Sequence, residues 1–153
     1  EWRGLEFVLI DTGGIELDDT NVFAEQMREQ ANMAIQMADV ILFMTDIRQG
    51  ITAVDKEIAF MLKKSKKPIV LVCNKADNYE KDQHEVYEFY NLGIGDPYPI
   101  SATSKTGLGD MLDVVIENFN TSNEETEENE IPKVAIIGKP NVGNSSIINK
   151  LGY

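Results

Sequence analysis

Short apolar runs recur along this chain, and each is typical of a buried parallel strand because it is brief, continuous and rich in β-branched residues. The runs cover residues 6–11, 40–45, 68–73, 98–100 and 133–137. The stretches between the first four runs are more polar, with apolar residues at the spacings of three and four that one helix face requires. Alternating strands and helices predict an α/β fold whose mostly parallel sheet lies between two layers of helices.

Helices are expected between and after these strands. The first lies within residues 18–37, and the second runs from a cap at Thr52 to about residue 66. The third stretch, residues 78–91, carries His84, which we interpret as a solvated helix residue rather than a ligand or base. Another helix is expected over residues 110–118. The aromatic side chains of the third stretch are expected to pack on the sheet rather than stack on bases: Tyr87, Phe89 and Tyr90.

Composition narrows the class of protein. With 153 residues, 42% of them apolar, the chain is expected to form one domain with a substantial core. The single cysteine, Cys73, excludes an internal disulfide framework and indicates a packed residue of a reduced, cytoplasmic protein. No apolar run is long enough to span a membrane, and no signal peptide is visible. A net charge of −12 argues against broad electrostatic capture of nucleic acid. No direct sequence-specific nucleic-acid contact is expected, while docking on an RNA–protein particle stays open.

Residues 120–130 lack apolar side chains and carry five glutamates, so this stretch cannot bury enough surface to order itself. We interpret residues 121–132 as an acidic linker between residues 1–120 and residues 133–153. An interaction tail is the alternative, although apolar residues resume after the stretch. The chain also begins at Glu1 and almost directly enters a strand, which is typical of a fragment or an engineered segment.

The third strand ends in Asn74-Lys75-Ala76-Asp77, at the edge where open α/β sheets bind ligands. An Asn amide can donate and accept hydrogen bonds. The carboxylate of Asp77 can accept two hydrogen bonds from a planar N–H/NH₂ edge such as that of guanine. The stem of Lys75 can lie flat over a ring. The pattern is short, and an Asp that caps a helix in a polar turn is the alternative.

The first strand ends in Asp11-Thr12-Gly13-Gly14. Two glycines at this position let the backbone approach a phosphate group closely. Asp11 is placed like an acid that holds Mg²⁺ through a water molecule. A plain turn is the alternative interpretation.

The last strand leads into a Gly-x-x-x-x-Gly pattern from Gly138 to Gly143, and Ser145 follows at a predicted helix start. This is the plan of a loop in which backbone N–H groups and a helix N-terminus surround phosphate, with Ser145 reaching Mg²⁺. Asn144 stands where the pattern requires lysine. Losing that charged contact costs roughly 1.5–3 kcal/mol, about tenfold to a hundredfold in nucleotide affinity, and should slow hydrolysis further.

Together these segments resemble motifs of translation-factor-class GTPases: residues 11–14, 74–77, 101–103 and 138–145. Longer stretches look like the Der (EngA) family, tandem-G-domain GTPases implicated in assembly of the large ribosomal subunit: residues 9–16, 26–31 and 95–102. The resemblance covers nearly the whole chain. It implies a P-loop NTPase fold of the Ras-like type, binding of GTP and GDP with Mg²⁺, and hydrolysis of GTP.

By that likeness, Asn74 and Asp77 read guanine, Lys75 flanks the ring, and Ser101 and Ala102 steady the base. Asp11 and Ser145 hold Mg²⁺, and Gly14 acts in catalysis by offering its N–H to the γ-phosphate. The phosphate-loop residues that bind nucleotide are Gly138, Asn141, Val142, Gly143, Asn144, Ser145 and Ser146. Ile15 stands where many relatives carry a water-orienting Gln; the family is similar to GTPases that manage without one, some using K⁺, for which Asn141 is the candidate ligand.

The order of the motifs departs from the family's domain, in which the phosphate loop and first switch precede Asp11. Here the loop follows the acidic linker, where a Der chain begins its second domain, and no first-switch threonine can be assigned. A Ras-like sheet places its first strand between those of residues 6–11 and 40–45, and an empty slot would expose two apolar edges. A linker of about 14 residues reaches roughly 46 Å, against the roughly 15 Å required.

We therefore predict that residues 133–137 fill this slot, which makes the chain a circularly permuted G domain without a first switch. The alternative is that residues 133–153 do not dock. Two functions remain as hypotheses. One is a GTP hydrolase of large-subunit assembly, impaired in this chain. The other is a module that holds GDP without turnover or presents a surface to a partner, as Asn144 and the absent first switch favour.

Overall fold

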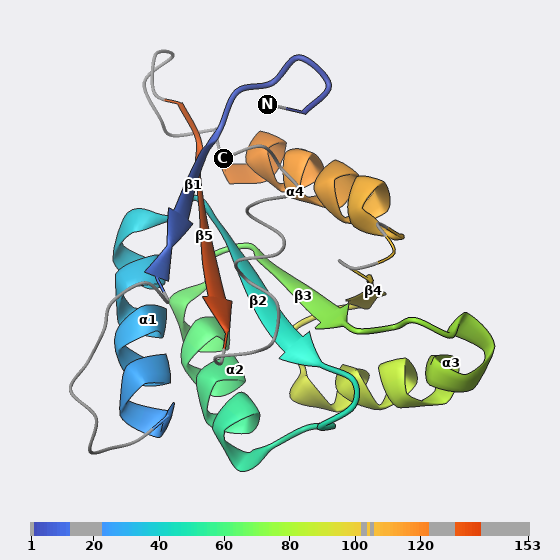
Figure 1. Cartoon of the computed structure of the whole chain (residues 1–153). Helices are drawn as coiled ribbons and strands as arrows, with labels where there is room; N and C mark the ends of the chain where they lie inside the picture. Colours follow the sequence, from blue (N-terminus) through green and yellow to red (C-terminus); the bar gives the residue numbers. More distant parts are fainter. Residues whose placement is uncertain (1, 13–22, 102–103, 105, 123–130, 139–153) are drawn as a thin grey trace.

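The computed structural model describes residues 2–12, 23–101, 104, 106–122 and 131–138. These residues form five strands: β1 (Val8–Asp11), β2 (Val40–Asp46), β3 (Ile69–Asn74), β4 (Pro97–Pro99) and β5 (Lys133–Gly138). The strands pair in the order β1-β5-β2-β3-β4, and every pair among them is parallel. Figure 1 shows them side by side, from β1 at one edge to β4 at the other. The predicted α/β fold is confirmed.

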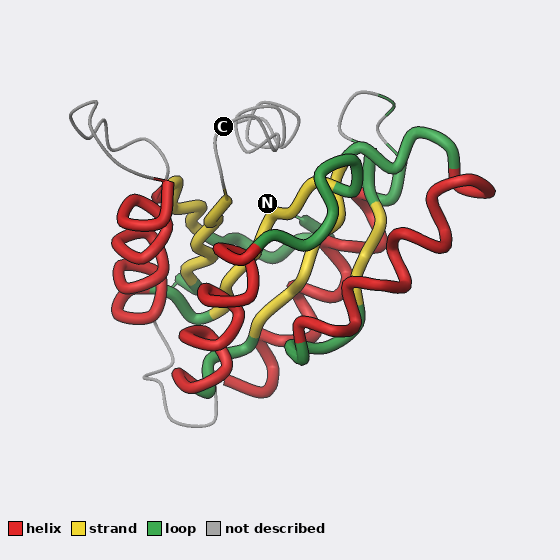
Figure 2. Tube along the Cα trace, turned by 90° about the horizontal axis from the view of Figure 1, so that it is seen from below, coloured by secondary structure: helices red, strands yellow, loops and turns green. Residues whose placement is uncertain are grey.

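Helices of the described residues cover both faces of the sheet, as the view in Figure 2 shows. They are α1 (Phe23–Met37), α2 (Ala53–Ser65), α3 (Tyr79–Glu88) with the following 3-10 turn η2 (Phe89–Leu92), and α4 (Leu108–Ser122). One cluster of buried side chains lies on each face of the sheet. Side chains of α1, α2 and η2 pack on one face with Ile41 and Phe43, while α4 packs on the other with Leu42 and Val70. The expected three-layer arrangement is therefore present.

The strand β5 lies inside the sheet, between β1 and β2, although it follows both in sequence. Ala135 is in register with Ile10 on one side and with Ile41 on the other. Residues 134–137 are completely buried, as an interior parallel strand with four consecutive apolar side chains should be. The C-terminal strand thus completes the sheet in the slot predicted for it.

Local sequence accounts for the ends of α2. The side chain of Thr52 accepts a hydrogen bond from the backbone N–H of Asp55, and Asp55 accepts one from the backbone of Thr52, which is a capping box. Lys66 ends the helix in the left-handed conformation, with φ of 60°. A helix from Thr52 to about residue 66 was predicted, and the structure confirms both ends.

Two expectations for the aromatic residues were wrong. Tyr87 is 71% exposed and Tyr90 47% exposed, and their rings contact each other at 5.2 Å between centroids instead of packing on the sheet. Phe89, between them, is buried as expected. Successive residues of a helical turn cannot all face the sheet, and the apolar position is taken by the side chain without a hydroxyl group. His84 is exposed and lies 4.0 Å from Glu88, as a solvated helix residue should.

Among the described helices, none combines the length and apolar character needed to cross a membrane. Most described elements also end close to the residues that the sequence predicts. The exception is α4, which begins at Leu108 and continues to Ser122, four residues beyond the expected end at residue 118. The polar residues at the C-terminus of α4 did not favour a helix, so the sequence-based prediction ended this helix too early.

Candidate functional site

Polar residues lie at or just after the carboxyl ends of four of the described strands, and a glycine ends the fifth. Asp11 ends β1, Asp46 ends β2, Asn74 ends β3, and Gly138 ends β5. Ser101 follows β4 by two residues. Because all these strands are parallel, their ends lie along one rim of the sheet, which is where open α/β folds bind ligands. The candidate site is therefore this rim.

The turn after β3 is held in an unusual backbone conformation. Lys75 has φ of 68°, in the left-handed region that a side chain with Cβ rarely adopts. The buried side chain of Asn74 stabilises it, because Asn74 Oδ1 accepts a hydrogen bond from the backbone N–H of Lys75 at 2.8 Å. The backbone N–H of Ala76 donates to the carbonyl oxygen of Ile100 at 3.0 Å. These bonds fix the turn against the neighbouring strand β4 and its loop.

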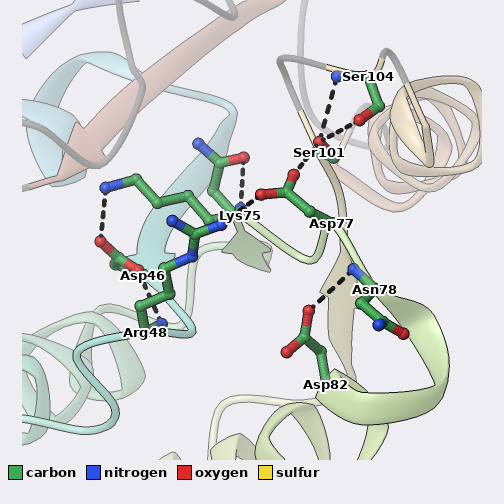
Figure 3. A network of polar contacts seen from close by, with 9 residues as sticks. Asp46, Arg48, Lys75, Asp77, Asn78, Asp82, Ser101 and Ser104 are labelled. Carbon is green, nitrogen blue, oxygen red and sulfur yellow. Dashed lines mark hydrogen bonds and ion pairs between the residues drawn. The ribbon is translucent and has the colours of Figure 1, made fainter.

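The loop after β2 contributes two residues to the same turn (Figure 3). Asp46, whose side chain is 3% exposed, accepts a hydrogen bond at Oδ2 from Lys75 Nζ at 2.8 Å. Its other oxygen, Oδ1, accepts one from the backbone N–H of Arg48, also at 2.8 Å. The buried carboxylate therefore has a cation and a backbone donor. The Asp46 carboxylate, at the end of β2, holds the ammonium of Lys75, whose stem extends from the end of β3 toward it.

Asp77 is bound at both carboxylate oxygens. Ser101 Oγ donates to Oδ1 at 2.6 Å, and Arg48 Nη2 donates to Oδ2 at 2.6 Å. Ser101 and Arg48 thus each occupy one oxygen of the carboxylate. The Asp77 side chain is 39% exposed, which leaves it accessible from solvent. Asp77 is thus a fixed, accessible acceptor of planar N–H donors.

The loop that carries Ser101 is closed by its own backbone. Ser101 and Thr106 exchange backbone hydrogen bonds at 3.0 and 3.1 Å. Gly107 follows with φ of 79°, and a Cβ there would lie 2.4 Å from the carbonyl oxygen of Pro99, so this position requires glycine. Within the loop, the backbone N–H of Ser104 donates to Ser101 Oγ at 3.2 Å. The Ser101 hydroxyl is thereby aimed at Asp77.

A second set of contacts lies at the ends of β1 and β5. Thr12 Oγ1 donates to the carbonyl oxygen of Ile136 at 2.7 Å and lies 3.2 Å from Gln30 Oε1. The backbone N–H of Gly138 donates to the same Gln30 oxygen at 3.2 Å. Gln30, on α1, is 7% exposed and Thr12 is 1% exposed. These contacts fix the point at which the chain leaves β5 for residues 139–146.

Cys73 lies directly before the turn of residues 74–77 and takes no part in the chemistry of that turn. Burial raises the pKa of its thiol to about 12, and the nearby hydroxyl of Thr45 only partly opposes that shift. A thiol with such a pKa is not a nucleophile near neutral pH. The prediction that Cys73 is a packed core residue is confirmed, with an exposure of 0%.

The structure brings together four of the residues predicted to bind a guanine base: Asn74, Lys75, Asp77 and Ser101. Asp11 and Gly138 lie at the same rim, on adjacent strands. Other predicted site residues fall outside the described part of the chain: Gly14, Ala102, Asn141, Val142, Gly143, Asn144, Ser145 and Ser146. Within the described part, no group of three or more His, Cys, Asp or Glu side chains is placed to hold a metal ion.

Sequence reasoning did not single out Asp46 or Arg48 as site residues. The signal available was the position of Asp46 at the carboxyl end of a buried strand, which is the same position that drew attention to Asp11. Each of the two residues pairs with a residue 29 positions later, Asp46 with Lys75 and Arg48 with Asp77. Parallel pairing of β2 and β3, in which Asp46 is in register with Asn74, brings the residues that follow the two strands close together.

Comparison with known proteins gives a consistent result. A family model described as "50S ribosome-binding GTPase" matches residues 1–75. The chain is 57% identical over 150 residues to a protein named GTPase Der from Agathobacter rectalis, and equally identical to one from Lachnospira eligens. Each match covers 98% of this chain and 34% of the relative. A GTPase Der from Clostridium tetani is 55% identical over 151 residues, again with 34% of its length matched. The chain thus spans about a third of the length of these relatives.

Proposed function

This chain belongs to the Der family of GTPases, and from that premise we propose that its rim of strand ends is a guanine-nucleotide site. The observation that carries the proposal is the fixed Asp77 carboxylate beside Lys75 and Asn74. Asp77 accepts hydrogen bonds from the N1–H and 2-amino groups of guanine. The stem of Lys75, held at its ammonium end by Asp46, flanks one face of the ring.

The phosphates are proposed to lie beyond the end of β5. Gly138 and the residues after it, Asn141 to Ser146, would supply backbone donors for them, and the position of Gly138 at the rim, where β5 ends, supports this proposal. Gly14 is proposed to donate its N–H to the γ-phosphate. These proposed roles come from the family resemblance. The residues that carry them follow Thr12 or Gly138 in sequence, and both of these contact Gln30.

Mg²⁺ fits the donors available at this end of the sheet. The ion prefers oxygen ligands, and Asp11 and Ser145 provide a carboxylate and a hydroxyl. These residues would hold the ion, which would supply positive charge to counter the negative charge that develops during phosphoryl transfer. K⁺ is proposed as an additional ion, with Asn141 as its ligand. The proposal for Asp11 is supported by its position at the end of β1, next to β5, which precedes Ser145 in sequence.

Hydrolysis of GTP to GDP is the activity proposed for the family domain, with impairment in this chain. The side chain of Asn144 has no charge to place against the β- and γ-phosphates. The lysine that the pattern requires at this position counters the negative charge that develops in the transition state. A second candidate function rests on the same residue. With Asn144 in place, the chain holds GDP without turnover and acts as a binding or interaction module.

Titration calorimetry with GDP and ADP tests the base assignment. GDP should bind and ADP should bind at least tenfold more weakly, because adenine offers Asp77 an acceptor and a C–H in place of two donors. Asp77→Asn should weaken GDP binding and strengthen binding of xanthosine diphosphate, whose 2-carbonyl can accept from the new amide. Equal affinities for GDP and ADP would remove the guanine assignment.

The Asn144→Lys variant separates hydrolysis from binding alone. It should raise nucleotide affinity about tenfold or more and increase phosphate release from GTP. Asn32→Lys, which adds the same charge at an exposed position of α1, is the matched control and should change neither. If Asn144→Lys changes neither quantity, the proposal that this chain is an impaired hydrolase is lost.

We further propose that residues 1–120 and 133–153 act as one nucleotide-binding domain joined by the acidic segment 121–132. Association with the large ribosomal subunit, in the cytoplasm, is proposed from the family and from the description of the matching model. Co-sedimentation of the purified chain with 50S particles, with and without a guanine nucleotide, tests that association.

A further inference from the structure

Arg48 reaches from the loop after β2 to the carboxylate proposed to read guanine. Its Nη2 atom lies 2.6 Å from Asp77 Oδ2, and its side chain is 66% exposed. Figure 3 shows the guanidinium of Arg48 beside Lys75 and pointing at Asp77. The donor therefore approaches Asp77 from the solvent side, next to the lysine that is proposed to flank the base.

The chemistry of this contact matches the chemistry of the proposed ligand. The N1–H and 2-amino edge of guanine is part of a planar N–C–N unit whose N–H donors point the same way. An arginine guanidinium is also a planar N–C–N unit with N–H donors that pair with a carboxylate. Arg48 thus presents to Asp77 the type of donor that a guanine edge presents.

Asp77 does not need Arg48 to keep its position. Ser101 Oγ holds the other carboxylate oxygen at 2.6 Å, and Ser101 itself is completely buried. Arg48 is also anchored independently of Asp77, because its backbone N–H donates to the buried Asp46 carboxylate. The exposed ion pair can therefore open by movement of one side chain while the loops on both sides stay fixed.

We propose that Arg48 is an internal substitute for the guanine edge: it binds Asp77 in the nucleotide-free protein and is displaced when the base binds. This rests on the guanine-site assignment made above and extends it to a residue that makes the site more selective. A base must offer Asp77 donors as good as those of Arg48 before it can replace them. Adenine lacks such donors and leaves Arg48 in place.

Arg48→Ala tests the inference, since it removes the internal competitor without touching the groups that contact the nucleotide. Opening an exposed ion pair of this kind costs a small free energy, so the variant should bind GDP about two- to fivefold more tightly. Inosine diphosphate, which lacks the 2-amino group, should gain by the same factor because the lost contact belongs to the free protein. Arg28→Ala, which breaks the exposed Arg28–Glu57 pair between α1 and α2, is the matched control and should change neither affinity.

Unchanged or weaker GDP binding by a folded Arg48→Ala variant would overturn the inference while leaving the guanine site intact. If wild-type protein binds no guanine nucleotide, the site assignment fails, and the inference fails with it. A second measurement covers a variant that does not fold. In the wild-type protein, the side-chain N–H resonances of Arg48 should shift on saturation with GDP, and resonances that stay unchanged at saturation would show that Arg48 is not displaced.

Discussion

Thr12 Oγ1 donates a hydrogen bond to the carbonyl oxygen of Ile136 at 2.7 Å, across 124 positions of sequence. The contact joins the residue after β1 to the strand that leads to the proposed phosphate loop. Gln30 accepts from the backbone N–H of Gly138 just beyond it. The ends of β1 and β5 are therefore fixed by side chains as well as by strand pairing, and the segments proposed to hold Mg²⁺ and phosphate start from one rigid point.

Replacing Thr12 with valine keeps the volume of the side chain and removes its donor. The Ile136 carbonyl then loses this buried partner, so the free energy of unfolding should fall by about 1–2 kcal/mol. Urea unfolding followed by circular dichroism measures the change. Thr106→Val, at an exposed position, should cost much less. Equal costs for the two variants would mean that the Thr12 contact contributes nothing specific to stability.

Lys75→Met should destabilise the protein because it leaves the Asp46 carboxylate, 3% exposed, without its cation. We expect a loss of about 1–2 kcal/mol, less than for a fully buried pair because the lysine side chain is 34% exposed. Asp46→Asn in the same background removes the charge that lacks a partner. The double variant should therefore be more stable than the sum of the single losses predicts, as a double-mutant cycle in urea can measure. Strict additivity would rule out the coupling.

Lys66→Gly should stabilise the protein by about 0.5–1 kcal/mol, because Lys66 ends α2 with φ of 60°, a conformation that costs little for glycine. The control is Lys56→Gly, in the exposed interior of α2, which should destabilise by about 1 kcal/mol. Thermal and urea unfolding of the two variants should move in opposite directions. A loss of stability in both would show that the Lys66 side chain makes a contribution larger than its backbone strain.

The pKa of Cys73 makes stability fall at high pH. Burial raises this pKa from 9.0 to about 12, so the folded state keeps a proton that the unfolded state releases above about pH 9. Stability from this group is complete below pH 9 and is lost as pH rises toward 12, with a slope of at most about 1.4 kcal/mol per pH unit. Cys73→Ala should lower stability at pH 7 but flatten that slope. Urea unfolding from pH 7 to 11 measures both, and parallel pH profiles for the two proteins would contradict the assignment.

Much of the fold could be predicted from the sequence because its elements depend on local patterns. The strand of residues 40–45 has an uninterrupted apolar pattern and is found as β2, completely buried. Thr52 and Asp55 predict a helix start, and the capping box is present. Even the insertion of β5 could be predicted, since an empty slot beside β2 would leave two apolar strand edges unpaired.

What could not be predicted depends on which side chains meet across the sheet. Nothing local marks Arg48 as the partner of Asp77, because that contact arises from the parallel register of β2 and β3. Likewise, Gln30 belongs to a helical pattern, and its contact with Gly138 requires β5 to be in place. Periodicity also could not separate Phe89 from Tyr90, since both are aromatic and adjacent, yet one is buried and the other is 47% exposed.

The interior position of β5 has a consequence for how residues 1–153 refold from the unfolded state. β5 follows its two neighbours β1 and β2 in sequence but must insert between them, so the sheet cannot close until β5 has docked. Collapse before β5 arrives would pair β1 directly with β2, and correcting that pairing requires the two strands to separate again. Refolding should therefore be slow relative to the size of the domain, with the closing of the sheet as its last step.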